Sequence, residues 1–385
     1  MDYTISKIVE QMPPSGIRVF FDLVLGMKDV ISLGVGEPDF VSPWHIREKA
    51  IYSLEQGYTS YTSNKGTVEL RKRVASFLEG RYQLSYDYNE EILITVGVSE
   101  GLDLAARAIL NPGDKVLIPD PCYVSYGPVV SLASGEPVSL KTDIANGFKV
   151  TPEDIKKSYV KGTKALMLNY PCNPTGASYT KEELKALARV IQKYDLLVLS
   201  DEVYDELTYD FDHTPLASLP GMKDRVIYLN GASKAYAMTG FRIGWVCGPK
   251  KIIAAMTKIH QYTMLCASIT GQMAAEEALK SGFKDVQMMK REYHRRRNYI
   301  VGALNEIGLD CHMPQGAFYV FPSIKRFKER SMDFSKNLLM KKKVALVPGV
   351  AFGPSWDTQV RISYASSYED LKEAVARITD YLKGK

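Results

Sequence analysis

The chain has 385 residues, of which 45% are apolar and 24% charged, and its formal net charge is +5. This composition is ordinary for a globular protein, and the small charge, without a long basic tract, gives no case for binding nucleic acid. No apolar run reaches the roughly 18 residues of a membrane span, and the start lacks the apolar core of a signal peptide, so we expect a cytoplasmic protein. Five widely spaced cysteines and five scattered histidines predict neither a disulfide framework nor a protein-bound metal.

Short apolar runs and helical stretches alternate through the middle of the chain. The first 45 residues show no clear repeat, and we expect them to pack on the C-terminal part or on a partner subunit. Between about residues 90 and 250, the pattern predicts a mainly parallel sheet with crossover helices. The expected strands are 92–96, 115–119, 165–169, 196–200, 226–230 and 243–247, and the clearest helices are 99–110 and 180–194.

The C-terminal part of the chain has a different pattern of apolar and helical stretches. A long helical region is predicted near 249–305, and three short apolar runs then alternate with helical pieces, which indicates a smaller α+β domain. The sequence therefore predicts an N-terminal segment (1–45), a large domain (46–280) and a small domain (281–385). Within the large domain, Thr180 and Glu183 form a capping-box pattern at the start of a helix.

Polar residues follow several of the predicted strands. Asn173, Asp201 and the pair Ser233 and Lys234 each come after a β-rich run, and Gly97–Ser99 opens a helix whose free N–H groups suit an anion. In an open parallel sheet, ligands bind beyond the carboxyl ends of the strands. These four sites are therefore expected to meet at one edge.

Lys234 is the candidate nucleophile. It lies in a turn of small residues, eight positions before Arg242. An ordinary lysine, with a pKa near ~10.4, is protonated at neutral pH, so covalent chemistry requires burial or a second cation that favours the neutral amine. Arg242 is the candidate cation, and we interpret Lys234 as a Schiff-base lysine.

Pyridoxal 5′-phosphate would use all of these groups, because it carries a phosphate, a basic ring nitrogen, a phenolic oxygen and an aldehyde. An ionised Asp201 beside the ring nitrogen would keep it protonated. The other candidate contacts are Asn173 and Tyr204 for the phenolic oxygen, Ser99 and Arg242 for the phosphate, and Tyr123 for the ring face.

Seven segments extend this pattern along nearly the whole chain: 31–40, 61–66, 173–176, 200–204, 233–242, 316–319 and 360–363. In this order and spacing they resemble the class I/II aminotransferases of fold type I, in the branch with prokaryotic aspartate, aromatic and alanine aminotransferases. The resemblance implies an α/β fold with a mainly parallel seven-stranded sheet flanked by helices, a smaller α+β domain and a homodimer.

The resemblance also implies roles for individual residues. Lys234 would hold the cofactor and carry the proton. Asp201 would face the pyridine nitrogen, and Asn173 and Tyr204 would bind the ring oxygen. Tyr123 would stack on the face of the ring. Val98, Ser99, Ser233, Arg242 and Tyr61 of the neighbouring subunit would surround the phosphate. Arg361 would grip the substrate α-carboxylate, helped by Gly36 and Asn173. Gly231 stands where some relatives have a serine, so one phosphate hydroxyl is expected to be missing.

The implied reaction is a ping-pong transfer of an L-amino acid's α-amino group to a 2-oxo acid such as 2-oxoglutarate. A carbon–sulfur β-lyase of the same fold is the nearest alternative, and a non-catalytic regulatory or binding protein is a remote one. The donor stays open among aromatic, alanine and aspartate types. Arg18 and Lys65 are candidate cations for a distal carboxylate, and the candidate pocket aromatics are Phe20, Phe21, Tyr58, Phe318 and Tyr319.

Overall fold

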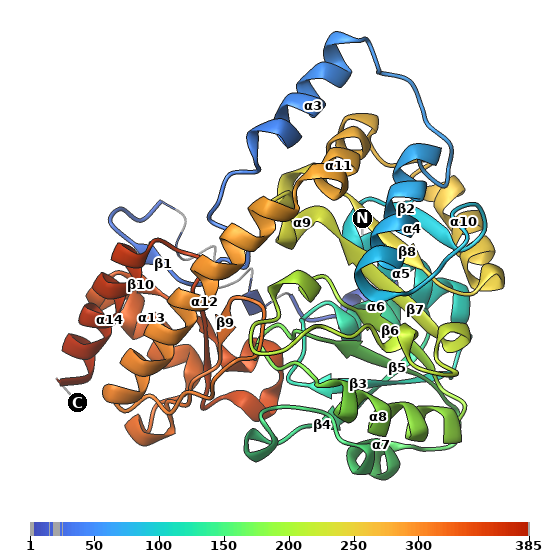
Figure 1. Cartoon of the computed structure of the whole chain (residues 1–385). Coiled ribbons are helices and arrows are strands. Elements are labelled where there is room, and N and C mark those ends of the chain that lie inside the picture. Colours follow the sequence, from blue (N-terminus) through green and yellow to red (C-terminus); the bar gives the residue numbers. More distant parts are fainter. Residues whose placement is uncertain (1–3, 15, 18–23, 25, 384–385) are drawn as a thin grey trace.

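The computed structural model describes residues 4–14, 16–17, 24 and 26–383, and its larger part is built around one β-sheet (Figure 1). The seven strands of this sheet follow the order β2-β8-β7-β6-β5-β3-β4. They are β2 (Ile92–Thr95), β3 (Lys115–Asp120), β4 (Glu136–Lys141), β5 (Thr163–Asn169), β6 (Leu197–Asp201), β7 (Val226–Gly231) and β8 (Gly244–Cys247). Strand β8 runs antiparallel to both neighbours, and the other strands are parallel. The predicted mainly parallel sheet is confirmed.

Most of these strands are buried on both faces, which explains their continuous apolar sequences. The sequence prediction missed β4. This edge strand is largely exposed, and its sequence Glu-Pro-Val-Ser-Leu-Lys is half polar. An edge strand needs no apolar side chains on both faces, so its pattern is weak.

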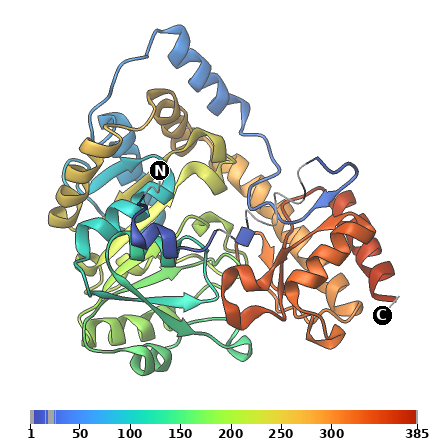
Figure 2. The ribbon, with the colours of Figure 1, turned by 180° about the vertical axis from the view of Figure 1, so that it is seen from behind.

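Helices cover both faces of the sheet (Figures 1 and 2). One face packs against α5 (Gly97–Ile109), α6 (Tyr126–Leu132) and α10 (Lys250–Thr263). The other packs against α4 (Val68–Tyr82), α7 (Pro152–Ser158), α8 (Lys181–Lys193), α9 (Ala232–Ala235) and α11 (Ile269–Ser281), and α3 (Trp44–Glu55) packs against α11. The capping box predicted for α8 is confirmed, since the Thr180 hydroxyl accepts from the Glu183 N–H and the Glu183 carboxylate accepts from the Thr180 N–H.

The C-terminal part forms its own apolar core beside the large sheet (Figure 2). Its helices are α12 (Phe283–Glu306), α13 (Ser331–Lys342) and α14 (Tyr368–Lys383). Its strands are β9 (Tyr319–Val320), β10 (Val344–Ala345), β11 (Val347–Pro348) and β12 (Val360–Ser363). The sheet β11-β12-β9 is antiparallel, which agrees with an α+β arrangement.

The N-terminal segment reaches both parts of the molecule. Its short helix α1 (Lys7–Gln11) lies near α6, and β1 (Ile31–Ser32) pairs in parallel with β10. The helical region predicted near 249–305 is divided into α10, α11 and α12, with a break at the turn before Ile269 and at Gly282. The domain limits drawn from the sequence stay a prediction. Within the described residues, the structure has no helix with the length and apolarity to cross a membrane.

Candidate active site

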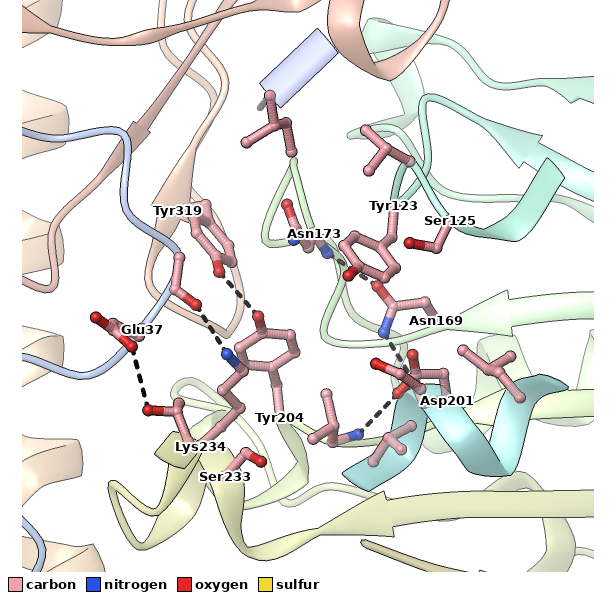
Figure 3. Close-up of a pocket in the computed structure, with 18 of the residues that line it drawn as sticks. Glu37, Tyr123, Ser125, Asn169, Asn173, Asp201, Tyr204, Ser233, Lys234 and Tyr319 are labelled. Atoms are coloured by element: carbon pink, nitrogen blue, oxygen red, sulfur yellow. Dashed lines mark hydrogen bonds between the residues drawn. The ribbon is translucent and has the colours of Figure 1, made fainter. Parts of the chain in front are cut away.

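A cavity of about 790 Å³ lies at the carboxyl ends of the central strands (Figure 3). Most of the predicted site residues line it: Gly36, Val98, Ser99, Tyr123, Asn173, Asp201, Tyr204, Ser233, Lys234, Arg242 and Arg361. Tyr61 does not line this cavity, and it is 83% exposed. The lining residues to which sequence analysis gave no role in the site include Glu37, Tyr126, Asn169 and Thr239.

Lys234 lies, partly buried, in the first turn after β7. Its Nζ donates a hydrogen bond to the Gly36 carbonyl at 2.8 Å and lies 5.8 Å from the centre of the Tyr204 ring. Burial lowers the pKa of Lys234 to about 8; Glu37 opposes this shift, and Arg361 and Arg242 reinforce it. The prediction that Arg242 favours the neutral amine is therefore incomplete, because burial has the larger effect and Arg361 contributes ahead of Arg242.

Asp201 ends β6 and is 5% exposed. Tyr126 donates a hydrogen bond to its Oδ2 at 2.8 Å, and the Val203 N–H donates to its Oδ1 at 3.3 Å. Burial raises the pKa of Asp201 to about 6, although the Tyr126 hydrogen bond acts against this rise. Both donors are neutral. A protonated ring nitrogen would supply the positive charge that they lack, so Asp201 fits the pyridine nitrogen of the predicted cofactor.

Two asparagines shape the loop after β5. Asn169 donates its side-chain N–H to the Asp201 carbonyl at 2.9 Å and accepts the Asn173 backbone N–H at 2.9 Å. The Asn173 side-chain oxygen in turn accepts from Arg361 at 2.8 Å. The amide nitrogen of Asn173 therefore remains as a donor for a ring oxygen. Asn169 is the last residue of β5, four positions before Asn173, and a polar residue at a strand end is the signal that would have identified it.

Arg361 on β12 is 2% exposed, and its guanidinium lies 4.6 Å from the centre of the Tyr319 ring and 5.1 Å from that of Phe352. One terminal nitrogen donates to Asn173 and the other donates to the Gly34 carbonyl at 2.6 Å. Within the described chain, its buried Nε has no hydrogen-bond partner. A guanidinium has five N–H groups. A carboxylate would fill the remaining donors and neutralise the buried charge.

The other end of the cavity suits a phosphate. Helix α5 begins there without a side-chain cap, so its first N–H groups are available to an anion. Gly97 has φ +74°, and a Cβ at this position would lie 2.5 Å from the Arg242 guanidinium. The backbone is therefore close to Arg242, and only glycine permits this approach. Ser233 lies at the start of α9 on the same side of the cavity (Figure 3).

The structure explains why position 231 is a glycine and not a serine. A Cβ at this position would lie 2.8 Å from the Ile243 carbonyl and 3.0 Å from the Gly244 Cα. A serine here would collide with the backbone of β8. The close packing of β7 and β8 therefore excludes the hydroxyl that some relatives carry.

Tyr204 completes the group of ring contacts. Its hydroxyl shares a 2.9 Å hydrogen bond with Tyr319 (Figure 3). Burial raises the pKa of Tyr204 well above its usual value. The hydroxyl therefore stays protonated at neutral pH and is able to donate to a ring oxygen.

The candidates for side-chain recognition have different positions. Lys65 donates to the Asn89 carbonyl and does not line this cavity, Tyr58 is 45% exposed, and Phe318 is buried in the C-terminal core. Tyr319 lines the cavity. The remaining candidates, Arg18, Phe20 and Phe21, lie outside the described residues.

The chain is similar to known proteins over almost its whole length. The family described as aminotransferase class I and II matches residues 28–378. The chain is 52% identical to the protein named "Putative aminotransferase YugH" of Bacillus subtilis (strain 168), over 98% of both chains. It is 45% identical to an aspartate aminotransferase of Pyrococcus abyssi, over 99% of this chain and 98% of the relative.

The fold has close structural relatives as well. The crystal structure of an aromatic aminotransferase from Pyrococcus horikoshii superposes with a TM-score of 0.91 at 43% identity, covering 96% of this chain and 99% of that chain. The fold predicted from the motifs is thereby confirmed.

Proposed function

The chain belongs to the class I and II aminotransferases, and we propose how its cavity serves the reaction of this family and which amino acids it accepts. It is a pyridoxal 5′-phosphate-dependent transaminase, which moves an amino group from an amino acid to a 2-oxo acid. The site proposal rests on one observation: Lys234, Asp201 and Arg361 line the same cavity.

The donor set fits the cofactor from end to end. Ser99, Ser233, Arg242 and the start of α5 would hold the phosphate. Asp201 would bind the ring nitrogen, Asn173 and Tyr204 would bind the phenolic oxygen, and Tyr123 would cover the ring. When bound, pyridoxal 5′-phosphate supplies an aldehyde and a ring that accepts electrons.

Residues of the protein bind the substrate and transfer the proton. Arg361 binds the substrate α-carboxylate and fixes the orientation of the Cα–H bond. Lys234, with its lowered pKa, takes the proton from the substrate Cα as general base. Asp201 keeps a negative charge beside the ring nitrogen. A base with a pKa of about 8 is close to neutral pH, where general catalysis is efficient.

The pH dependence of cofactor capture tests the state of Lys234. We expect the covalent capture of pyridoxal 5′-phosphate by the apoenzyme to accelerate by about tenfold per pH unit and to level off near pH 8, because only the neutral amine attacks an aldehyde. Stopped-flow absorbance measures this rate. Glu37→Gln, which removes the carboxylate that raises the pKa of Lys234, should shift the midpoint to lower pH. A midpoint near that of an ordinary lysine would contradict the assignment.

The substrate side chain is expected to be apolar. In the described part of the lining, the cationic side chains are Lys234, Arg242 and Arg361, and each has a role above. Ile17 and Val124 line the same cavity and pack beside Phe352 near Arg361. A buried carboxylate without a cation costs several kcal/mol. We therefore propose an aromatic or aliphatic L-amino acid as donor, and the same argument favours an acceptor 2-oxo acid without a second carboxylate.

A donor panel tests this proposal. In the half-reaction without an acceptor, the second-order rate constant for phenylalanine should exceed that for aspartate by at least about tenfold, since each ~1.4 kcal/mol of differential binding changes this ratio tenfold. A preference for aspartate would overturn the substrate proposal and leave the transaminase assignment intact. The predicted cytoplasmic location is not addressed by this experiment and stays a prediction.

We propose a homodimer in which Tyr61 of the partner subunit reaches the phosphate. The supporting observation is a set of exposed apolar side chains on α3 and on the segments just before and after it. Helix α3 projects at the top of Figure 1. The residues in this set and their exposed fractions are Val41 72%, Trp44 58%, Leu54 57%, Tyr58 45% and Tyr61 83%. Contiguous apolar surface of this kind commonly marks a subunit interface.

Mixed dimers test whether Tyr61 acts across the interface. Tyr61→Phe should weaken cofactor binding by about 10- to 100-fold, because a hydrogen bond to a charged group is lost. Refolding this variant together with Lys234→Ala creates hybrids in which one site has both residues, so activity at limiting cofactor should recover. Tyr58→Phe serves as the control for the mutant interface. No recovery, with hybrids demonstrated by mass, would contradict the proposal.

A further inference from the structure

An aromatic bridge joins the C-terminal part to the large sheet beside the cavity. It consists of Phe148, Phe321, Phe352 and Trp356, which are 7%, 3%, 3% and 7% exposed. Phe148 lies between β4 and α7, and the other three belong to the C-terminal part. Its ring centre lies 5.7 Å from that of Phe321 and 5.5 Å from that of Trp356. The bridge therefore fixes the two parts of the molecule against each other.

One partly buried hydrogen bond connects the bridge to the end of β3. The Trp356 indole Nε1 donates to Asp120 Oδ1 at 2.6 Å. Asp120 is the last residue of β3, three positions before Tyr123. Gly353 has φ +144°, and a Cβ there would collide with Asp120 Oδ1, so glycine is required for this approach. The loop of two 3₁₀ turns, Gly349–Phe352 and Pro354–Trp356, is thus held against the end of β3.

The same loop contacts the proposed carboxylate receptor. The ring of Phe352 lies 5.1 Å from the Arg361 guanidinium. The loop also continues directly from β11, in which Val347 pairs with Arg361 of β12. A continuous series of contacts therefore runs from Arg361 through Phe352, Phe321 and Trp356 to Asp120, and then along three residues of chain to Tyr123.

We propose that the hydrogen bond between Trp356 and Asp120 positions the 349–356 loop so that Arg361 lies at the distance from Tyr123 that a bound substrate requires. This inference rests on the proposed role of Arg361. Neither Asp120 nor Trp356 lines the described cavity, so both are positioning residues that act through Phe352 and Arg361. Arg361 makes its contacts with the substrate carboxylate, and Tyr123 covers the cofactor ring. Loss of this hydrogen bond should therefore affect substrate binding more than cofactor binding.

The experiment measures binding of 3-phenylpropionate, an unreactive apolar carboxylate, to the holoenzyme by titration calorimetry. Trp356→Phe removes the N–H donor and keeps an aromatic ring, and Asp120→Ala removes the acceptor. Each should weaken binding by about tenfold, because a displaced 349–356 loop would leave Arg361 misplaced relative to the carboxylate. The double variant should lose no more than either single variant, because both remove the same interaction. KM for the amino donor should rise in parallel, with kcat and cofactor affinity nearly unchanged.

Three controls separate positioning from stability. Asp120→Asn keeps an oxygen that accepts the indole N–H, and it should bind the carboxylate as the wild type does. Phe148→Leu removes ring contacts in the bridge but keeps the hydrogen bond, so it should lower the melting temperature without the tenfold loss of affinity. Arg361→Lys should lose carboxylate binding whether or not the Trp356–Asp120 hydrogen bond positions Arg361.

The outcomes are distinguishable. If Trp356→Phe and Asp120→Ala lower the melting temperature but bind the carboxylate normally, the contact is only structural and the inference is wrong. If one variant does not fold, the other still decides. If Arg361→Lys also binds normally, the proposed role of Arg361 is wrong and the inference falls with it.

Discussion

Lys234→Ala is expected to lower turnover by more than about 10⁴-fold, since general acid–base catalysis alone contributes about 10² to 10⁴ and covalent capture of the cofactor is lost as well. The side chain is partly buried, its Nζ donates to the Gly36 carbonyl, and its pKa is lowered to about 8. An alanine leaves a cavity in which the substrate and cofactor are still bound but no base reaches the substrate Cα.

Two measurements check this expectation. Steady-state rates give the loss of turnover, and borohydride reduction followed by peptide mass analysis should place the cofactor on Lys234 in the wild type and on no equivalent peptide in the variant. Lys185→Ala, which removes an exposed lysine paired with Glu182 on α8, is the matched control and should be fully active. A variant at position 234 with substantial turnover would refute the assignment.

Asp201→Asn is expected to lower kcat by about 10²- to 10⁴-fold. The asparagine keeps the size of the side chain and still accepts from Tyr126, but it cannot hold a charge beside a protonated ring nitrogen. Removing one partner of a buried ion pair costs about 3 to 5 kcal/mol, which corresponds to this range. Exchange of the substrate Cα proton with deuterium, followed by NMR, reports the affected step directly.

Asp205→Asn provides the control for this experiment. Asp205 is also a buried carboxylate, burial raises its pKa to about 6, and it bonds Tyr82 rather than facing the cavity. Its replacement should change stability more than kcat. Equal losses of proton exchange in the two variants would show that a buried carboxylate in this region matters only for folding.

The sequence predicted most of the large sheet because strands buried on both faces require continuous apolar residues. Strand β4 was not predicted because it lies at an exposed edge, where the sequence is half polar. The strand-end rule predicted that Asn173, Asp201 and Lys234 share one cavity, since parallel strands place their carboxyl ends together. Topology alone carries that information.

Other parts of the site depend on tertiary contacts that no local pattern encodes. Tyr126 bonds Asp201 across a sequence separation of 75 residues, and Asn169 connects Asp201 with Asn173. The lowered pKa of Lys234 comes mainly from burial, which depends on the whole cavity. The contact between Trp356 and Asp120 spans 236 positions. Such pairs become visible only when the chain is folded.

The most direct test uses the holoenzyme with S-benzyl-L-cysteine and no acceptor. This amino acid has an apolar side chain and a carbon–sulfur bond at Cβ, so the same substrate reports transamination or β-elimination. The account predicts one equivalent of the 2-oxo acid per subunit, with the amino group retained by the enzyme and no free thiol. Continuous release of thiol, pyruvate and ammonia would contradict it.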